Sequence, residues 1–192
     1  MLRPQNPTDE LDGLRQAVLN APTIADVYKH YRGENVPDEE FFKNALSDTF
    51  GLPSDKVDEF KKRGVEVLGV SIDSQFSHLA WRNTDRKKGG IGQIQYPLLA
   101  DLDKKISRDY GVLADAGIAF RGLFLIDKEG VVQHALVNNL PLGRNVDEAL
   151  RMVDALQHHE EHGEVCPANW KKGDEAMKPG PKESQPYFAK HN

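Results

Sequence analysis

The sequence predicts an α/β fold, because short apolar strands alternate with helical stretches from residue 65 onward. Residues 65–73 read V-E-V-L-G-V-S-I-D, an almost continuous β-branched run that is typical of a strand buried on both faces. Residues 120–127, F-R-G-L-F-L-I-D, form a second run of this kind. The hydrophobic fraction of 39% and the charged fraction of 29% suit a packed core rather than a disordered chain.

The elements around these two strands follow in a regular order. After the first strand we predict a helix over residues 76–82, a loop over 87–92, a strand over 96–100 and a helix over 103–110. After the second strand, a tight turn and an alternating stretch at 131–137 predict the return strand of a hairpin. Asn145 is placed to cap a last helix, which has apolar residues at helical spacing. This order predicts an α/β sheet of the thioredoxin type.

The first 58 residues have a different pattern. Apolar spacing and capping residues predict short helices over residues 11–19, 23–33, 37–50 and 52–64, with no convincing strand among them. We therefore expect a small helical segment of unknown function at residues 1–58. The partial α/β core is expected at 59–160 and a C-terminal tail at 161–192.

Composition excludes several classes of function. The net charge of −5 argues against a nucleic-acid-binding protein, since such proteins cluster Lys and Arg against phosphates. Apolar runs stay well short of the roughly 20 residues that span a bilayer, and the first residues lack a signal-peptide core. The single cysteine excludes an intrachain disulfide framework, so we expect a cytoplasmic protein without a cofactor.

Six stretches follow one another in unbroken order between about residue 59 and residue 192. They read G-V-E-V-L-G-V-S-I-D-S-Q-F-S-H-L-A-W-R-N, K-G-G-I-G-Q-I-Q-Y-P-L-L-A-D, F-R-G-L-F-L-I-D-K-E-G, L-P-L-G-R-N-V-D-E-A-L-R, H-G-E-V-C-P-A-N-W and Y-F-A-K-H-N. In these stretches the chain resembles the typical two-cysteine peroxiredoxins, the alkyl hydroperoxide reductase C or thiol-specific antioxidant family. The resemblance implies thiol-dependent reduction of hydrogen peroxide and organic hydroperoxides, a thioredoxin-like reductant, and a homodimer or higher oligomer.

The same resemblance assigns roles to individual residues. Cys166, in the V-C-P motif, is implied to be the resolving cysteine, and Arg121 and Arg144 are implied to lie near the peroxide. A G-G-x-G loop and a C-terminal Tyr-Phe pair are implied to control how readily the tail leaves the reactive site. These residues are Gly89, Gly90, Gly92, Tyr187 and Phe188. A lone cysteine is more commonly a small buried hydrophobic residue, and Arg121 also suits a structural ion pair.

One part of the family pattern is missing. The peroxidatic motif, roughly P-x-x-F-T-F-V-C-P-T-E, does not occur upstream of residue 65, where the chain reads F-F-K-N-A-L-S-D-T-F-G-L-P-S-D-K-V-D-E-F-K-K. We therefore expect the strand that carries this motif to be absent, which leaves the two buried strands without a neighbour. The junction near residues 58–62 favours a fusion of two unrelated sequences.

The residues thus support only the resolving half of the reaction, and two other readings stay open. The chain can be a non-catalytic partner that joins the oligomers of an intact peroxiredoxin through the 131–137 hairpin or the tail, and offers Cys166 in trans. The stretch H-H-E-E-H at 158–162 also matches a zinc-binding pattern, with His158 and His162 on one helix face. The alternative is a solvated helix end, where histidine suits the helix dipole. The family resemblance explains this stretch without a metal, so no metal is predicted.

Overall fold

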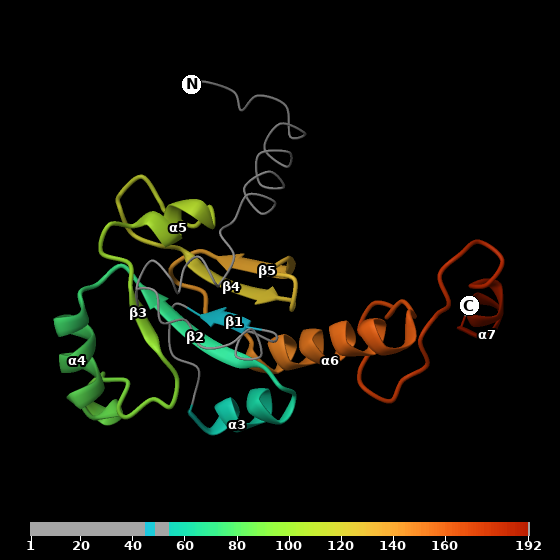
Figure 1. Ribbon diagram of the computed structural model, residues 1–192, viewed down its shortest axis with the longest axis horizontal. Coiled ribbons are helices and arrows are strands. Elements are labelled where there is room, and N and C mark those ends of the chain that lie inside the picture. Colours follow the sequence, from blue (N-terminus) through green and yellow to red (C-terminus); the bar gives the residue numbers. More distant parts are fainter. Residues whose placement is uncertain (1–44, 49–53, 192) are drawn as a thin grey trace, which may run out of the picture. The chain divides into compact units, whose positions relative to one another are not determined.

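The computed structural model describes residues 45–48 and 54–191, which form two compact units (Figure 1). The first unit ends at Arg144 and the second begins at Asn145. Each is described by itself below. The helices predicted over residues 11–19 and 23–33 lie outside the described residues. The domain boundaries predicted at residues 58 and 160 remain predictions.

A five-stranded sheet with the order β3-β2-β1-β4-β5 forms the first unit (Figure 1). β1 is parallel to β2, and β2 is parallel to β3, whereas β4 is antiparallel to both β1 and β5. The strands are β1 (Ala45–Asp48), β2 (Glu66–Ser71), β3 (Leu98–Ala100), β4 (Arg121–Ile126) and β5 (Val132–Asn138). The strands and hairpin predicted from residue 65 onward are therefore confirmed, with ends shifted by at most two residues.

β1 occupies the centre of the sheet and corrects the sequence analysis. Its residue Leu46 is in register with Val67 of β2 on one side and with Leu125 of β4 on the other. The prediction of a helix over residues 37–50 is thus wrong for residues 45–48. The expectation that the two buried strands lack a neighbour is wrong as well, since residues 45–48 pair with both. Four residues are too few to show a strand periodicity, so only pairing with neighbouring strands decides this conformation.

The core of this unit lies against the two long central strands. Every residue from Val67 to Ser71 and from Gly122 to Ile126 is buried, as a strand covered on both faces requires. Phe124 and Tyr110 pack edge to face with ring centroids 4.8 Å apart. α3 (Ser54–Lys62) confirms the helix predicted there and contributes its buried side chains Val57 and Phe60.

The other helices of the first unit follow β2 and β3. α4 (Gln75–Asn83) begins at the cap residue Ser74, and the short helix η2 (Arg86–Lys88) follows it. α5 (Lys105–Asp109) is fixed by the fully buried Asp101, whose carboxylate accepts the backbone N–H groups of Ile106 at 2.9 Å and of Ser107 at 2.7 Å. A buried carboxylate satisfied in this way joins the end of β3 to the start of the helix.

The second unit consists of one long helix and a tail. Asn145 caps α6 (Val146–His162) by accepting the N–H groups of Asp147 and Glu148, as predicted, and Gly163 ends it in the left-handed conformation. A backbone bridge joins Val165 to Met177, and α7 (Gln185–His191), which the sequence analysis did not predict, follows. None of the helices in the described ranges is long and apolar enough to cross a membrane.

The double pairing of β1 generates a prediction about stability. Replacing Leu46 by Pro removes a backbone N–H from the central strand, so we expect a loss of about 3 kcal/mol or more in unfolding free energy, measured by urea denaturation. Leu46→Val, which keeps the N–H and favours strand geometry, is the matched control and should lose far less stability than Leu46→Pro. Equal stability of the two variants would show that residues 45–48 do not complete the sheet.

Candidate functional site

The thiol of Cys166 lies in the second unit, just after the end of α6. Its Sγ donates a weak hydrogen bond to the carbonyl oxygen of Ala155 at 3.6 Å, and the residue is half-buried. The preceding residue, Val165, exchanges two backbone hydrogen bonds with Met177, at 2.7 and 2.9 Å. The cysteine is therefore held between a helix and a two-residue bridge rather than within a long sheet ladder.

Arg151 fastens the segment that follows the cysteine to α6. Its guanidinium binds both carboxylate oxygens of Glu148, each at 2.7 Å, and donates through Nη1 to the carbonyl of Trp170 at 2.9 Å. Trp170 is itself buried, and its indole N–H donates to the carbonyl of Asp174 at 3.0 Å. A forked guanidinium can make these bonds simultaneously, so one side chain connects the helix with the chain on the far side of Cys166.

Burial raises the pKa of the Cys166 thiol. The positive charge of Arg151 acts in the opposite direction and lowers this pKa, while the negative charge of Glu164 raises it. The net effect keeps the sulfur protonated near neutral pH. Because the thiolate is the nucleophile, Cys166 is a slow nucleophile until it becomes exposed or approaches another cation.

The histidines at the end of α6 hold the turn that leads to the cysteine. The His158 ring is paired with the Glu164 carboxylate at 3.0 Å and lies against Trp170, with ring centroids 4.9 Å apart. The His159 ring contacts the Glu164 carbonyl at 2.8 Å. Within residues 45–48 and 54–191, no three His, Cys, Asp or Glu side chains are gathered to hold a metal ion. The contacts of His158 and His159 with Glu164 and Trp170 give this stretch a structural role, which is to hold the turn before Cys166.

The two predicted peroxide-site arginines belong to the first unit. Arg121 opens β4, and its Nε donates to the carbonyl of Leu140 at 2.5 Å. Arg144 is the last residue of that unit and is partly buried. Cys166 belongs to the second unit, and the roles of the two arginines near the peroxide remain predictions.

The G-G-x-G loop is a locally determined turn attached to α4. Gly89 and Gly92 have φ values of +84° and +65°, which residues with a side chain rarely adopt. At Gly90 a Cβ atom would come within 2.0 Å of the Thr84 carbonyl oxygen. The Trp81 indole N–H donates to the carbonyl of Gly89 at 3.0 Å, so the glycines are needed for close approach to the helix.

The Tyr-Phe pair lies in α7. Tyr187 stacks on His191 with centroids 4.3 Å apart, and Phe188 is about half exposed. Glu175 anchors the end of this helix through ion pairs with Lys190 and His191. The control of the reactive site by this pair and by the glycine loop remains a prediction.

Sequence reasoning missed the residues that surround the thiol. Glu148 and Arg151 are three apart, which indicates a helix-surface ion pair. The bond from Arg151 to Trp170 spans 19 residues and leaves no local signal. Only the folded chain shows that this arginine faces the segment next to the cysteine.

Comparison with known proteins gives consistent matches. The family model described as AhpC/TSA matches residues 52–135, and the one described as the C-terminal domain of 1-Cys peroxiredoxin matches residues 155–190. Peroxiredoxin-2 of Rattus norvegicus is 54% identical over 169 residues, which cover 84% of each chain. The chloroplastic 2-Cys peroxiredoxin BAS1 of Hordeum vulgare is 47% identical over 196 residues, which cover 90% of this chain and 93% of the relative.

A solved structure confirms the thioredoxin-like fold. The crystal structure of reduced 2-Cys peroxiredoxin from Plasmodium vivax has a TM-score of 0.74 and 46% identity, covering 78% of this chain and 83% of the other.

The similarity to these relatives begins upstream of residue 59. The two sequence matches cover 84% and 90% of this chain, which is more than residues 59–192 alone would give. The fusion of two unrelated sequences remains a prediction.

The two charges near the thiol generate opposite predictions. Arg151→Gln should raise the Cys166 pKa and Glu164→Gln should lower it. Both are read from the midpoint of the pH profile of iodoacetamide alkylation rather than from the rate at one pH, because Arg151 also fastens the segment next to the thiol. Each shift should correspond to a change of about threefold in the acid dissociation constant, because partly exposed charges interact weakly. Lys172→Gln, whose lysine pairs with Asp154 at 3.8 Å, is the matched control for charge loss. Identical pH profiles for all three variants would contradict the electrostatic account.

Proposed function

The chain belongs to the peroxiredoxin antioxidant family, and from this premise we propose that it supplies a resolving thiol, Cys166. The observation that carries the proposal is the state of this sulfur, which is half-buried, bonded to a helix carbonyl and raised in pKa. Such a thiol suits a slow, controlled reaction with a sulfenic acid better than a direct attack on peroxide. The 192 residues contain no second cysteine, so the sulfenic acid must come from another chain.

The reaction we propose has two thiol partners. An intact two-cysteine peroxiredoxin reduces a peroxide and becomes a cysteine sulfenic acid, with release of water or an alcohol. The Cys166 sulfur loses its proton and attacks the sulfenic sulfur. The S–O bond breaks, and the oxygen leaves with the proton of the thiol as water. The mixed disulfide is then reduced with two electrons from a dithiol protein.

The attachment of Cys166 supports this role. The Val165–Met177 bridge and the contact from Arg151 to Trp170 consist of few hydrogen bonds, so local opening of this segment requires few bonds to break. Opening would expose the sulfur by breaking these contacts within the second unit.

Assembly with an intact peroxiredoxin follows from the same premise. β5 forms one edge of the sheet among the described strands. Val137 within it and Val131 just before it are each about half exposed. An edge strand can pair with the corresponding strand of another chain, and the C-terminal tail is the second candidate contact. We propose a homodimer or a higher oligomer, including mixed oligomers with an intact relative.

The reductant and the compartment are proposed by analogy. One similar structure, 52% identical with a TM-score of 0.59, is described as Plasmodium yoelii thioredoxin peroxidase I, which favours a thioredoxin-like dithiol. The relatives include a chloroplastic protein and a mitochondrial one. A cytoplasmic location for this chain is accordingly a proposal that fractionation of cells would test.

Direct turnover is the first test of the proposal. With excess dithiothreitol, consumption of hydrogen peroxide by the wild type should not exceed that by Cys166→Ser, because the protonated thiol is not an activated nucleophile. The consumption is measured over time with a peroxide-sensitive dye. Rapid consumption that depends on Cys166 would instead identify this residue as a peroxidatic cysteine.

Resolution in trans is the second test. A two-cysteine peroxiredoxin lacking its own resolving cysteine is treated with one equivalent of hydrogen peroxide and mixed with this chain. We expect a mixed-disulfide band on a non-reducing gel, which dithiothreitol removes and which Cys166→Ser does not form. Loss of peroxide without this band would contradict the proposal, and omission of peroxide is the control.

A further inference from the structure

The chain makes a tight turn directly after Cys166. Trp170 donates its backbone N–H to the carbonyl of Pro167 at 3.0 Å, which closes a turn of four residues. The third residue of the turn, Asn169, has a φ of +63°. The second residue, Ala168, is not among the non-glycine residues with a positive φ in the described ranges. A negative φ followed by a positive one is the pattern of a type II turn.

Asn169 occupies the position of this turn that favours glycine. In the left-handed region the Cβ atom comes close to the following carbonyl oxygen, which costs free energy. Asparagine tolerates this region better than most residues do, whereas a β-branched residue there is a genuine outlier. The Asn169 side chain is exposed, so burial of that side chain does not select the conformation. The turn therefore carries a strain that glycine in the same place would lack.

The turn also places Trp170, which anchors the chain after Cys166 to α6. Trp170 is 3% exposed, and its ring lies against that of His158 with centroids 4.9 Å apart. Its carbonyl accepts a hydrogen bond from Arg151 at 2.9 Å. Since Asn169 directly precedes this anchor, the strain in the turn acts against the contacts that hold the chain to the helix.

Two glycines bound the short segment that contains the thiol, residues 164–172. Gly163 has a φ of +67° and Gly173 a φ of +100°. A Cβ atom at either position would meet nothing within 4 Å, so the backbone conformation rather than crowding favours glycine there. Residues at the ends of elements that accept large changes in φ and ψ act as hinges, and these two glycines are suited to that role.

We propose that the strained turn at Asn169 sets how readily residues 164–172 open, and thereby how fast Cys166 resolves the sulfenic acid of a partner. The strain raises the free energy of the closed segment and is released when the segment leaves α6. Asn169 does not touch the reacting sulfur, so it is a positioning residue that acts through Trp170. The link to resolution rests on the function proposed above, whereas the effect on opening does not.

The first test is amide hydrogen exchange of the full chain, measured by NMR. Val165 and Met177 donate the two bonds of the backbone bridge, so exchange of their N–H groups reports opening of the segment. Asn169→Val should raise the opening equilibrium about tenfold, because a β-branched residue is disfavoured at positive φ. Asn169→Gly should lower it about threefold, because glycine adopts this φ without strain.

The matched control is Ala168→Val, which places the same side chain one residue earlier in the turn. Ala168 is also exposed but has a negative φ, so opening should change less than twofold. The Phe124 amide of β4 should keep its protection in every variant, since the effect is confined to the segment. Unchanged exchange at Val165 in both Asn169 variants would overturn the proposal, and so would equal effects of Asn169→Val and Ala168→Val. If Asn169→Val also loses protection at Phe124, Asn169→Gly alone decides.

The second test is the rate of mixed-disulfide formation with the oxidised peroxiredoxin that lacks its own resolving cysteine. Asn169→Val should react faster than the wild type and Asn169→Gly more slowly, and neither change alters the charges around the sulfur. Equal rates despite altered exchange would overturn the link between opening and resolution. Absence of the disulfide in every variant would contradict the function proposed for Cys166, and exchange at Val165 would still decide the role of Asn169.

Discussion

The double hydrogen bonding of β1 is the constraint on which the first unit depends. β2 and β4 are buried on both faces, so their backbone groups can find partners only in strands of the same sheet. β1 supplies those partners on both sides at once, from Ala45 to Asp48. The chain has no cysteine upstream of Cys166, yet a strand is present between these two neighbours. The neighbouring strands need backbone hydrogen-bond partners at this position, and residues 45–48 supply them whatever their side chains are.

In the second unit one side chain affects both the structure and the reactivity of the thiol. Arg151 donates a hydrogen bond to the carbonyl of Trp170, and its positive charge lowers the pKa of Cys166. Burial of the sulfur outweighs that cation, and the thiol stays protonated. A thiol restrained in this way reacts only when its segment opens or when a reactive sulfur is delivered to it. The arrangement therefore fits a resolving role more readily than attack on a freely diffusing peroxide.

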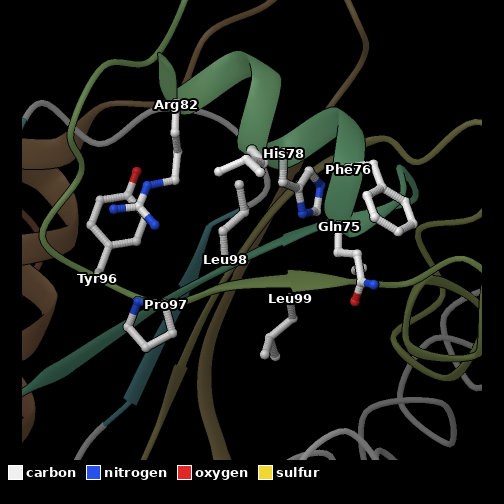
Figure 2. Close-up of a pocket in the computed structure, with 10 residues that line it drawn as sticks. Gln75, Phe76, His78, Arg82, Tyr96, Pro97, Leu98 and Leu99 are labelled. Atoms are coloured by element: carbon white, nitrogen blue, oxygen red, sulfur yellow. The ribbon is translucent and has the colours of Figure 1, made fainter.

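One face of the helix α4 carries polar side chains among its apolar ones. Its stripe includes His78 and Arg82 where a purely structural helix would have apolar residues. The strand opposite, β3, is short, and a pocket of about 580 Å³ lies between the two elements (Figure 2). The adjacent glycine loop is tied to the same helix through Trp81, so this edge of the sheet is organised around α4.

The sequence by itself determined the elements with strong periodicity or strong caps. The buried β-branched runs that become β2 and β4, the hairpin to β5, and the Asn145 cap of α6 are local signals, and the family resemblance rests on contiguous motifs. Only the tertiary structure decided that residues 45–48 form a strand, because four residues carry no period and their partners lie about 20 and 80 residues away. The contact of Arg151 with Trp170 and the burial of the His78 ring were likewise decided by packing. Each depends on which distant segment comes to face a side chain, and no local pattern records that.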